Sequence, residues 1–243
     1  MHGILLAGGT GSRLGPLTKV VNKHLLPVHE LPMIVYPLKT LMACGVGNIL
    51  IVSGREHIGQ LAGLLGSGAE YGCRLSYRVQ EKPGGIAEAL MVGNDFTRSS
   101  HIAVILGDNI FLPAPEIPTL PVGAAHVFLS KVKDARPFGV AKLNGDLITS
   151  IIEKPQEPPS DLAVTGLYVF PWTVFRDMRE ARYAASARGE LEITDVLNMY
   201  CPSALSWSIV DGYWGDAGTV DGIAEATEAV IAYKAALHAK GEA

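Results

Sequence analysis

The first 110 residues alternate short apolar runs with segments of helical spacing, and this alternation limits the possible folds more than any other feature. Nearly continuous apolar strands are typical of a parallel sheet covered on both faces, and short strand–helix–strand links are made by right-handed crossovers. The sequence therefore predicts a three-layer α/β/α, Rossmann-like fold around a mixed, mostly parallel central sheet. The expected elements are strand 4–7, helix 33–44, strand 48–53, helix 56–65, strand 75–79, helix 86–92 and strand 102–106.

The pattern changes beyond residue 110. Four prolines between residues 113 and 121 predict an irregular connection. No internal repeat and no domain boundary stand out, so we expect a single domain over residues 1–243. The expected elements of this half are strands 124–130, 139–143, 147–152, 163–170 and 206–210, and helices 172–182 and 220–239.

A glycine-rich turn, Gly8–Leu14, follows the first predicted strand. Small residues let backbone N–H groups turn inward around an anion, most often a phosphate, and Arg13 and Lys23 add positive charge. The turn is not a dinucleotide fingerprint, because Leu14 stands where the third glycine is needed, and no Gly-Lys-Ser/Thr of a Walker loop occurs. The alternative is an ordinary strand-to-helix turn with a surface arginine.

Further polar residues follow other predicted strands, which places them at the same edge of the sheet. Asp108 and Asp216 stand among glycines and form a carboxylate pair suited to Mg²⁺, which takes one or two protein carboxylates plus substrate phosphates. Both could instead cap turns. Glu153 and Lys154 could bind sugar hydroxyls and a phosphate, or be a solvated pair. Gln80 beside Gly84-Gly85 suits a base edge, as a weak signal.

Bulk properties exclude several classes of protein. The chain has 20 basic and 24 acidic residues, a net charge of −4, without a basic block, so we expect no nucleic-acid partner. Apolar runs are too short for a membrane span or a signal peptide, and three widely spaced cysteines make neither a disulfide framework nor a zinc site. We therefore expect a cytoplasmic protein. No Ser-His-Asp or Cys-His spacing indicates covalent catalysis.

In order along nearly the whole chain, the motifs resemble those of sugar-phosphate nucleotidylyltransferases. Within that family the resemblance is strongest to members that use dTTP and glucose 1-phosphate. The matching segments are 8–14, 23–27, 32–38, 80–87, 106–111, 138–140, 153–155, 164–168, 189–195 and 214–219.

The resemblance implies a nucleotide-diphospho-sugar transferase fold, with residues 1–110 as the nucleotide-binding half and 111–243 as the sugar- and metal-binding half. It implies that a sugar 1-phosphate oxygen attacks the α-phosphorus of dTTP in line, giving a dTDP-sugar and pyrophosphate with Mg²⁺ as cofactor. It also implies a possible homo-oligomer, a dimer or a tetramer. The implied roles are nucleotide binding by Gly8, Gly9, Gly11, Arg13, Gln80, Pro83 and Gly85; sugar-phosphate binding by Asn109, Gly139, Glu153, Lys154 and Thr165; metal binding by Asp108 and Asp216; and catalysis by Arg13, Lys23, Asp108 and Lys154.

Two departures from the family pattern matter. Leu197 and Asn198 stand where the family usually has Asn-Arg, whose arginine helps to hold the sugar phosphate. Another cation could compensate, the sugar phosphate could be held weakly, or a different substrate could be used. The sequence also ends at residue 243, and the long bacterial form continues with helices of an allosteric site. We therefore expect a short form with weak or absent feedback inhibition.

Three other functions are alternatives at this stage. A uridylyltransferase or dual-specificity enzyme differs only in contacts to a methyl group and a 2′-hydroxyl, which discriminate by ~1–3 kcal/mol. The missing arginine is compatible with a non-catalytic nucleotide-sugar sensor, although Arg13, Lys23, Asp108 and Asp216 argue against one. Leu14 disfavours a nicotinamide oxidoreductase.

Overall fold

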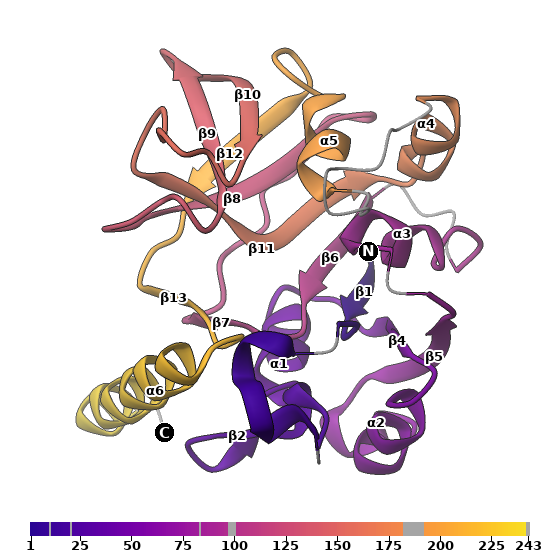
Figure 1. Cartoon of the computed structure of the whole chain (residues 1–243), viewed down its shortest axis with the longest axis vertical. Helices are drawn as coiled ribbons and strands as arrows, with labels where there is room; N and C mark the ends of the chain where they lie inside the picture. The colour runs from indigo at the N-terminus through magenta and orange to yellow at the C-terminus, as the bar shows by residue number, and fades with distance from the viewer. Residues whose placement is uncertain (10, 20, 83, 97–100, 182–191, 242–243) are drawn as a thin grey trace.

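A computed structural model describes residues 1–241, with gaps at 10, 20, 83, 97–100 and 182–191 (Figure 1). Its N-terminal half contains four parallel strands in the order β6-β1-β4-β5. The apolar residues of β1, β4 and β6 are almost all buried, as a sheet covered on both faces requires, whereas those of the edge strand β5 are only partly buried. The bounds are β1 His2–Leu6, β4 Asn48–Gly54, β5 Arg74–Gln80 and β6 His101–Leu106.

Helices cover both faces of this sheet, and alternate residues of one strand enter different cores. In β1, Ile4 belongs to the core that contains residues of α3, α4 and α5, whereas Leu5 belongs to the core that contains residues of α1 and α2. This is the period-two alternation of a strand between two helical layers. The helices are α1 Val35–Ala43, α2 Ile58–Leu65, α3 Ile86–Met91, α4 Val174–Glu180 and α5 Ile193–Asn198.

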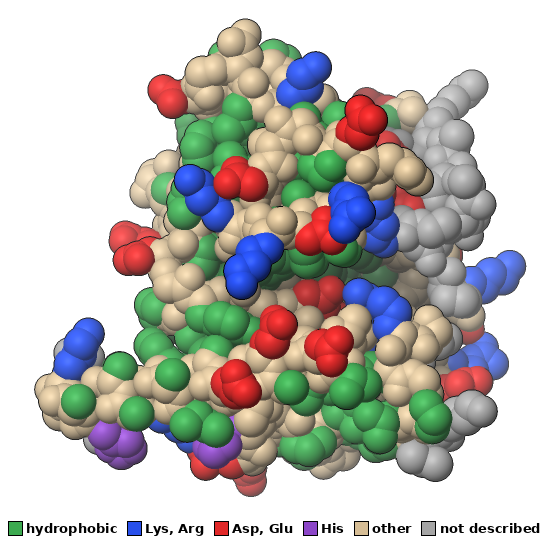
Figure 2. Space-filling model, turned by 60° about the vertical axis from the view of Figure 1, so that its left-hand side comes forward, with side chains coloured by type: hydrophobic (Ala, Val, Ile, Leu, Met, Phe, Trp, Pro, Cys, Tyr) green, Lys and Arg blue, Asp and Glu red, His purple; other side chains and the backbone are tan. Residues whose placement is uncertain are grey.

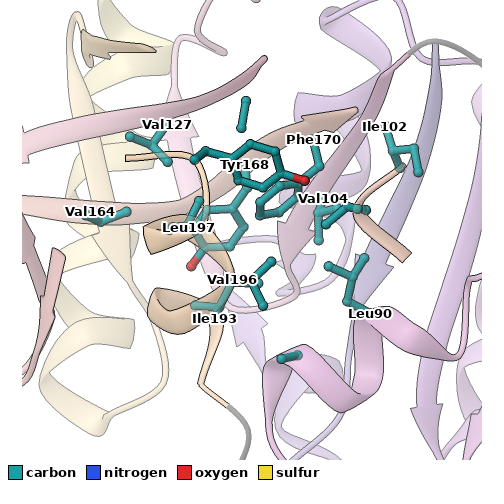
Figure 3. Packing of buried hydrophobic residues seen from close by; sticks show 14 of the residues in the cluster. Leu90, Ile102, Val104, Val127, Val164, Tyr168, Phe170, Ile193, Val196 and Leu197 are labelled. Carbon is teal, nitrogen blue, oxygen red and sulfur yellow. The ribbon is translucent and has the colours of Figure 1, made fainter. Parts of the chain in front are cut away.

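The long strand β11, Leu162–Pro171, joins this parallel sheet to a second half of the molecule (Figure 1). It is antiparallel to β6 over Leu167–Pro171, pairs with β8 both near its start and at Tyr168 and Val169, and meets β9 at Ala163. Figure 3 shows α5 side chains packed with Tyr168 and Phe170 of β11, so this core underlies both halves. The remaining strands of the sheet are β8 Ala125–Lys131, β9 Gly139–Asn144, β10 Leu147–Glu153 and β12 Leu205–Ile209.

A separate two-stranded ribbon crosses between the halves. It pairs β7, Asn109–Leu112, antiparallel with β13, Tyr213–Asp216. Helix α6, Val220–Lys240, follows the ribbon and projects from the body in Figure 1. No described helix is both long and apolar enough to cross a bilayer. The other short elements are β2 Pro27–Val28, β3 Leu31–Pro32 and 3₁₀ segments at Ser12–Lys19, Lys23–Leu25 and Ala69–Tyr71.

The predicted three-layer α/β/α fold with a mixed central sheet is confirmed. Every long strand and helix expected from the sequence is present within two residues of its predicted bounds, and residues 113–124 contain no strand or helix. Several elements were not expected: α5, both strands of the ribbon, the β2–β3 hairpin and the 3₁₀ segments.

Candidate active site

A cleft of about 300 Å³ opens where β1, β5, β6, β10 and β13 end. Figure 2 shows a hollow on one face of the molecule with acidic and basic side chains gathered around it. Apart from its apolar walls, the cleft is lined by Gly8, Gly9, Arg13, Lys23, Gln80, Gly85, Asp108, Asn109, Gly139, Glu153, Lys154, Gly166, Tyr168, Thr194, Trp214 and Asp216.

The glycine turn gives way to a 3₁₀ segment rather than to an α-helix. Gly8 and Gly9 line the cleft, but Gly11 is not among its lining residues. Gly11 has φ +66°, and a Cβ there would lie 2.6 Å from the Thr18 side chain and 3.2 Å from Lys23 Cβ. A glycine is therefore needed at position 11 so that the turn can pack closely against Thr18 and Lys23.

Lys23 and Asp108 form a buried ion pair at the centre of the cleft. Lys23 Nζ donates to Asp108 Oδ2 at 2.6 Å, and the two side chains are only 12% and 9% exposed. Burial alone would raise the pKa of Asp108, but the charge of Lys23, with smaller effects that include hydrogen bonds from Lys23 and Asn109, lowers it. His24 is no counter-charge, since burial and Lys23 lower its pKa to about 3.

Asp216, at the end of β13, lines the same part of the cleft as Asp108, which immediately precedes β7. Arg13 Nη1 donates to Asp216 Oδ2 at 3.3 Å, and the Arg13 side chain is 56% exposed. Burial and the neighbouring Asp108 carboxylate raise the pKa of Asp216, against the lowering effect of Arg13. The ribbon sets this position, because Asp216 pairs with Asn109 and Ala217 N donates to Asp108 O at 2.8 Å.

The space between the two carboxylates is kept open by Gly218. A Cβ at Gly218 would lie 2.8 Å from Asp216 Oδ1, 3.0 Å from Asp108 Oδ2 and 2.7 Å from Arg13 Nη2. Two carboxylate oxygens converging on one small space form a donor set that suits Mg²⁺ completed by water and substrate oxygens. In the described residues no three His, Cys, Asp or Glu side chains gather in metal-ligand geometry. The carboxylate pair therefore fits a substrate-completed magnesium site.

Asn109 ties the two carboxylates to the sheet. Its Oδ1 accepts from Gly166 N at 2.9 Å and from Trp214 Nε1 at 2.7 Å, while its Nδ2 donates to Asp108 Oδ1 at 3.1 Å. A Cβ at Gly166 would overlap the Asn109 amide, so glycine is required for this contact. Asn109, assigned to the sugar phosphate by the resemblance, is thus first of all a buried link between β7, β11 and β13.

At one end of the cleft, Gln80 ends β5 and faces the glycine turn. A Cβ at Gly8 would lie 2.7 Å from Gln80 Oε1. Gln80 Nε2 donates to Glu88 Oε2 at 2.9 Å and to Gly85 O at 3.3 Å. Glu88, in the first turn of α3, also accepts from Gly84 N at 2.7 Å. Glu88 is not among the cleft-lining residues but holds Gln80, a role that the sequence did not indicate.

The opposite end holds the Glu153-Lys154 pair at the end of β10. Lys154 has φ +44°, and its backbone N–H donates to Phe138 O at 2.9 Å. A positive φ in a residue with a side chain stores strain and is typical of functional sites. Phe138 and Trp214 meet edge to face at 5.2 Å and form an aromatic wall beside the pair. This wall was also not predicted.

Helix α5, Ile193–Asn198, carries Leu197 and Asn198, the first departure from the family pattern. Asn198 binds the backbone of β10, accepting from Ile151 N at 2.7 Å and donating to Ile151 O at 2.8 Å. Leu197 is fully buried and lines the cleft. This helix therefore presents an apolar wall where the family pattern expects a cation.

Thr165 is a second predicted site residue, after Gly11, that does not line the cleft. Thr165 is fully buried in β11, is not among the cleft-lining residues, and its hydroxyl has no hydrogen-bond partner among the described residues. Since side chains alternate along a strand, Val164 and Gly166 face the cleft and Thr165 faces away. Pro83 lies outside the described residues, as do Thr10 and residues 189–191 of the matching segments.

A Rossmann-like sheet with a charged, glycine-rich cleft at its strand ends defines a nucleotide-binding class of enzyme. The family model described as nucleotidyl transferase matches residues 2–232. The chain belongs to this nucleotidyl transferase family.

Several relatives share one name. The glucose-1-phosphate thymidylyltransferase of Neisseria gonorrhoeae is 44% identical over 95% of this chain and 82% of its own length. The enzyme of that name from Mycolicibacterium smegmatis is 38% identical over the same shares. A Bacillus anthracis protein described as a glucose-1-phosphate thymidylyltransferase, solved with sucrose, has a TM-score of 0.84 and 44% identity, covering 94% of both chains. A UDP-glucose pyrophosphorylase at 23% identity and TM-score 0.78 shares the fold.

Proposed function

We propose that this nucleotidyltransferase joins dTTP to α-D-glucose 1-phosphate, giving dTDP-glucose and pyrophosphate with Mg²⁺ as cofactor. The observation that carries the proposal is the convergence of Arg13, Lys23, Asp108 and Asp216 in one cleft, with the Gln80 amide at one end and Glu153-Lys154 at the other. The named relatives at 38–44% identity support the choice of substrates.

The triphosphate would lie over the glycine turn. Gly8 and Gly9 allow the phosphate oxygens to approach the backbone. Arg13 and Lys23, which pair with Asp216 and Asp108 in the structure, would bind phosphate oxygens instead when the nucleotide is present. Asp108 and Asp216 would hold Mg²⁺, which when bound neutralises charge on the phosphate oxygens. Lys23 and Arg13 would share that neutralisation during attack at the α-phosphorus.

The sugar phosphate would enter from the opposite end. Lys154 would hold its phosphate, and Glu153 would accept hydrogen bonds from sugar hydroxyls. Gly139 keeps space there, since a Cβ would lie 2.8 Å from the Thr194 side chain. Because Asn198 is hydrogen-bonded to the Ile151 backbone in β10, we assign the role of the arginine usual in the family to Lys154.

Direct in-line transfer needs alignment and charge neutralisation rather than a protein nucleophile. The attacking oxygen belongs to a phosphate that is already ionised near neutral pH, so this step needs no general base. The protein's part is to hold the two substrates end to end in the cleft and to limit water between them.

Pyrophosphate release tests the proposal, measured with dTTP, UTP, CTP, ATP and GTP against a panel of sugar 1-phosphates. We expect the highest kcat/KM with dTTP and glucose 1-phosphate, and loss of turnover in Asp108→Asn and Asp216→Asn. Preference for UTP would make the chain a uridylyltransferase. Tight dTTP binding without turnover of any pair would instead indicate a sensor.

A further inference from the structure

The side-chain amide of Gln80 is held in one orientation by the residues around it. Gln80 is buried at the end of β5, and its Nε2 donates to Glu88 Oε2 and Gly85 O. An amide nitrogen has two hydrogens. Both are therefore used within the protein, and the carbonyl oxygen Oε1, beside Gly8, is the group left to meet a ligand.

Glu88 makes the reverse orientation unfavourable. An ionised carboxylate only accepts hydrogen bonds, and so does the Gly85 carbonyl. Turning the Gln80 amide over would set its oxygen against both acceptors and leave them without their donor. Glu88 is itself held, because its Oε2 also accepts from Gly84 N at 2.7 Å. The side chain of Gln80 therefore offers the cleft an acceptor rather than a donor.

We propose that Glu88 is a positioning residue that determines base specificity through Gln80. This inference rests on the proposed function, in which Gln80 faces the pyrimidine of the nucleotide. Thymine and uracil carry a hydrogen-bond donor at N3, which an amide oxygen accepts. Cytosine has an acceptor at N3, which would face Gln80 Oε1 without a hydrogen. The Glu88–Gln80 pair thus selects imide pyrimidines and rejects cytosine, without distinguishing thymine from uracil.

The test compares kcat/KM for dTTP and dCTP in the wild type, Glu88→Ala and Glu88→Gln. In Glu88→Ala the amide can turn over, so we expect the dTTP/dCTP ratio to fall by about tenfold or more. Glu88→Gln keeps an acceptor oxygen for Gln80 and Gly84, and should restore most of the ratio. Glu81→Ala, which removes an exposed partner of Arg55 on the neighbouring loop, serves as the matched control and should leave the ratio unchanged.

Thermal unfolding of the same variants separates specificity from folding. If Glu88→Ala lowers the melting temperature but keeps the wild-type ratio, Glu88 only caps α3 and the inference is wrong. If the wild type releases no pyrophosphate from dTTP, the proposed function fails. The inference is then decided by the equilibrium affinities of dTTP and dCTP for the wild type and Glu88→Ala: equal affinities for the wild type would overturn it.

Discussion

Gly218→Ala is the substitution whose effect follows most directly from the geometry of the carboxylate pair. The new Cβ would lie 2.7 Å from Arg13 Nη2, 2.8 Å from Asp216 Oδ1 and 3.0 Å from Asp108 Oδ2. Contacts of carbon with other heavy atoms are normally about 3.5 Å or longer, so each group must move by roughly 0.5–0.8 Å. The methyl group would also fill space between the oxygens proposed to bind the metal.

Displacements of this size are expected to lower activity strongly. A misplacement of ~1 Å in a reacting site costs ~10²-fold, and Mg²⁺ tolerates little departure from octahedral geometry. We therefore expect kcat/KM to fall about 100-fold, or ~2.7 kcal/mol of transition-state stabilisation. Folding should change little, because Gly218 does not have a positive φ.

The assay is pyrophosphate release with saturating Mg²⁺, together with Mn²⁺ titration in the presence of dTTP. Gly63→Ala in α2 is the matched control, because a Cβ there meets no atom within 4 Å. It should keep full activity and gain ~0.5–1 kcal/mol of stability from the better helix propensity of alanine. Wild-type activity and metal affinity in Gly218→Ala would refute the assignment of the metal site.

Three further predictions follow from contacts in the cleft and the core. Because Lys23 already neutralises Asp108, Mn²⁺ followed by electron paramagnetic resonance should bind weakly without nucleotide and much more tightly with dTTP; equal affinities would contradict this. Asn198→Ala should lower the free energy of unfolding by about 1–3 kcal/mol in urea, because two backbone groups of Ile151 lose their partner, with KM for dTTP unchanged. Burial lowers the pKa of His126 to about 4. The unfolded state binds a proton on this histidine near pH 6.5, before the folded state does. The neutral buried imidazole therefore contributes its full share of the free energy of unfolding above pH 6.5, and this share is lost as the pH falls toward 4. Denaturation at pH 7 and pH 5 should show the wild type losing about 2 kcal/mol more than His126→Gln.

The strands and the location of the cleft were predictable because both depend on local sequence. Buried parallel strands are continuous apolar runs, and the residues that follow them meet at one sheet edge. Gly8, Gln80, Asp108 and Glu153 were assigned to the cleft on that basis, and all four line it.

What the sequence did not reveal depends on distant partners. Strands β7 and β13 are four residues each, and their pairing joins segments about a hundred positions apart. The carboxylate space at Gly218 and the bond from Trp214 to Asn109 come from this pairing. Glu88 was missed because a glutamate in the first turn of a helix is an ordinary capping residue.

Thr165 and Gly11 show a different limit. A motif indicates that a segment is near the site, but strand alternation decides which side chains enter the cleft. Thr165 lies on the far side of β11, and Gly11 serves packing. The roles that the resemblance gives them, and that of Pro83, stay predictions.

The ribbon of β7 and β13 has a consequence for how the enzyme is made. Asp108 is synthesised early, but its partner Asp216 follows about a hundred positions later in the chain. Until β13 pairs with β7, an emerging chain can form the glycine turn but lacks one of the two carboxylates proposed to hold the metal–triphosphate complex. Nucleotide and metal should therefore bind the chain with β7 and β13 paired far better than a chain in which they are not yet paired. By mass action, this binding should favour the paired state.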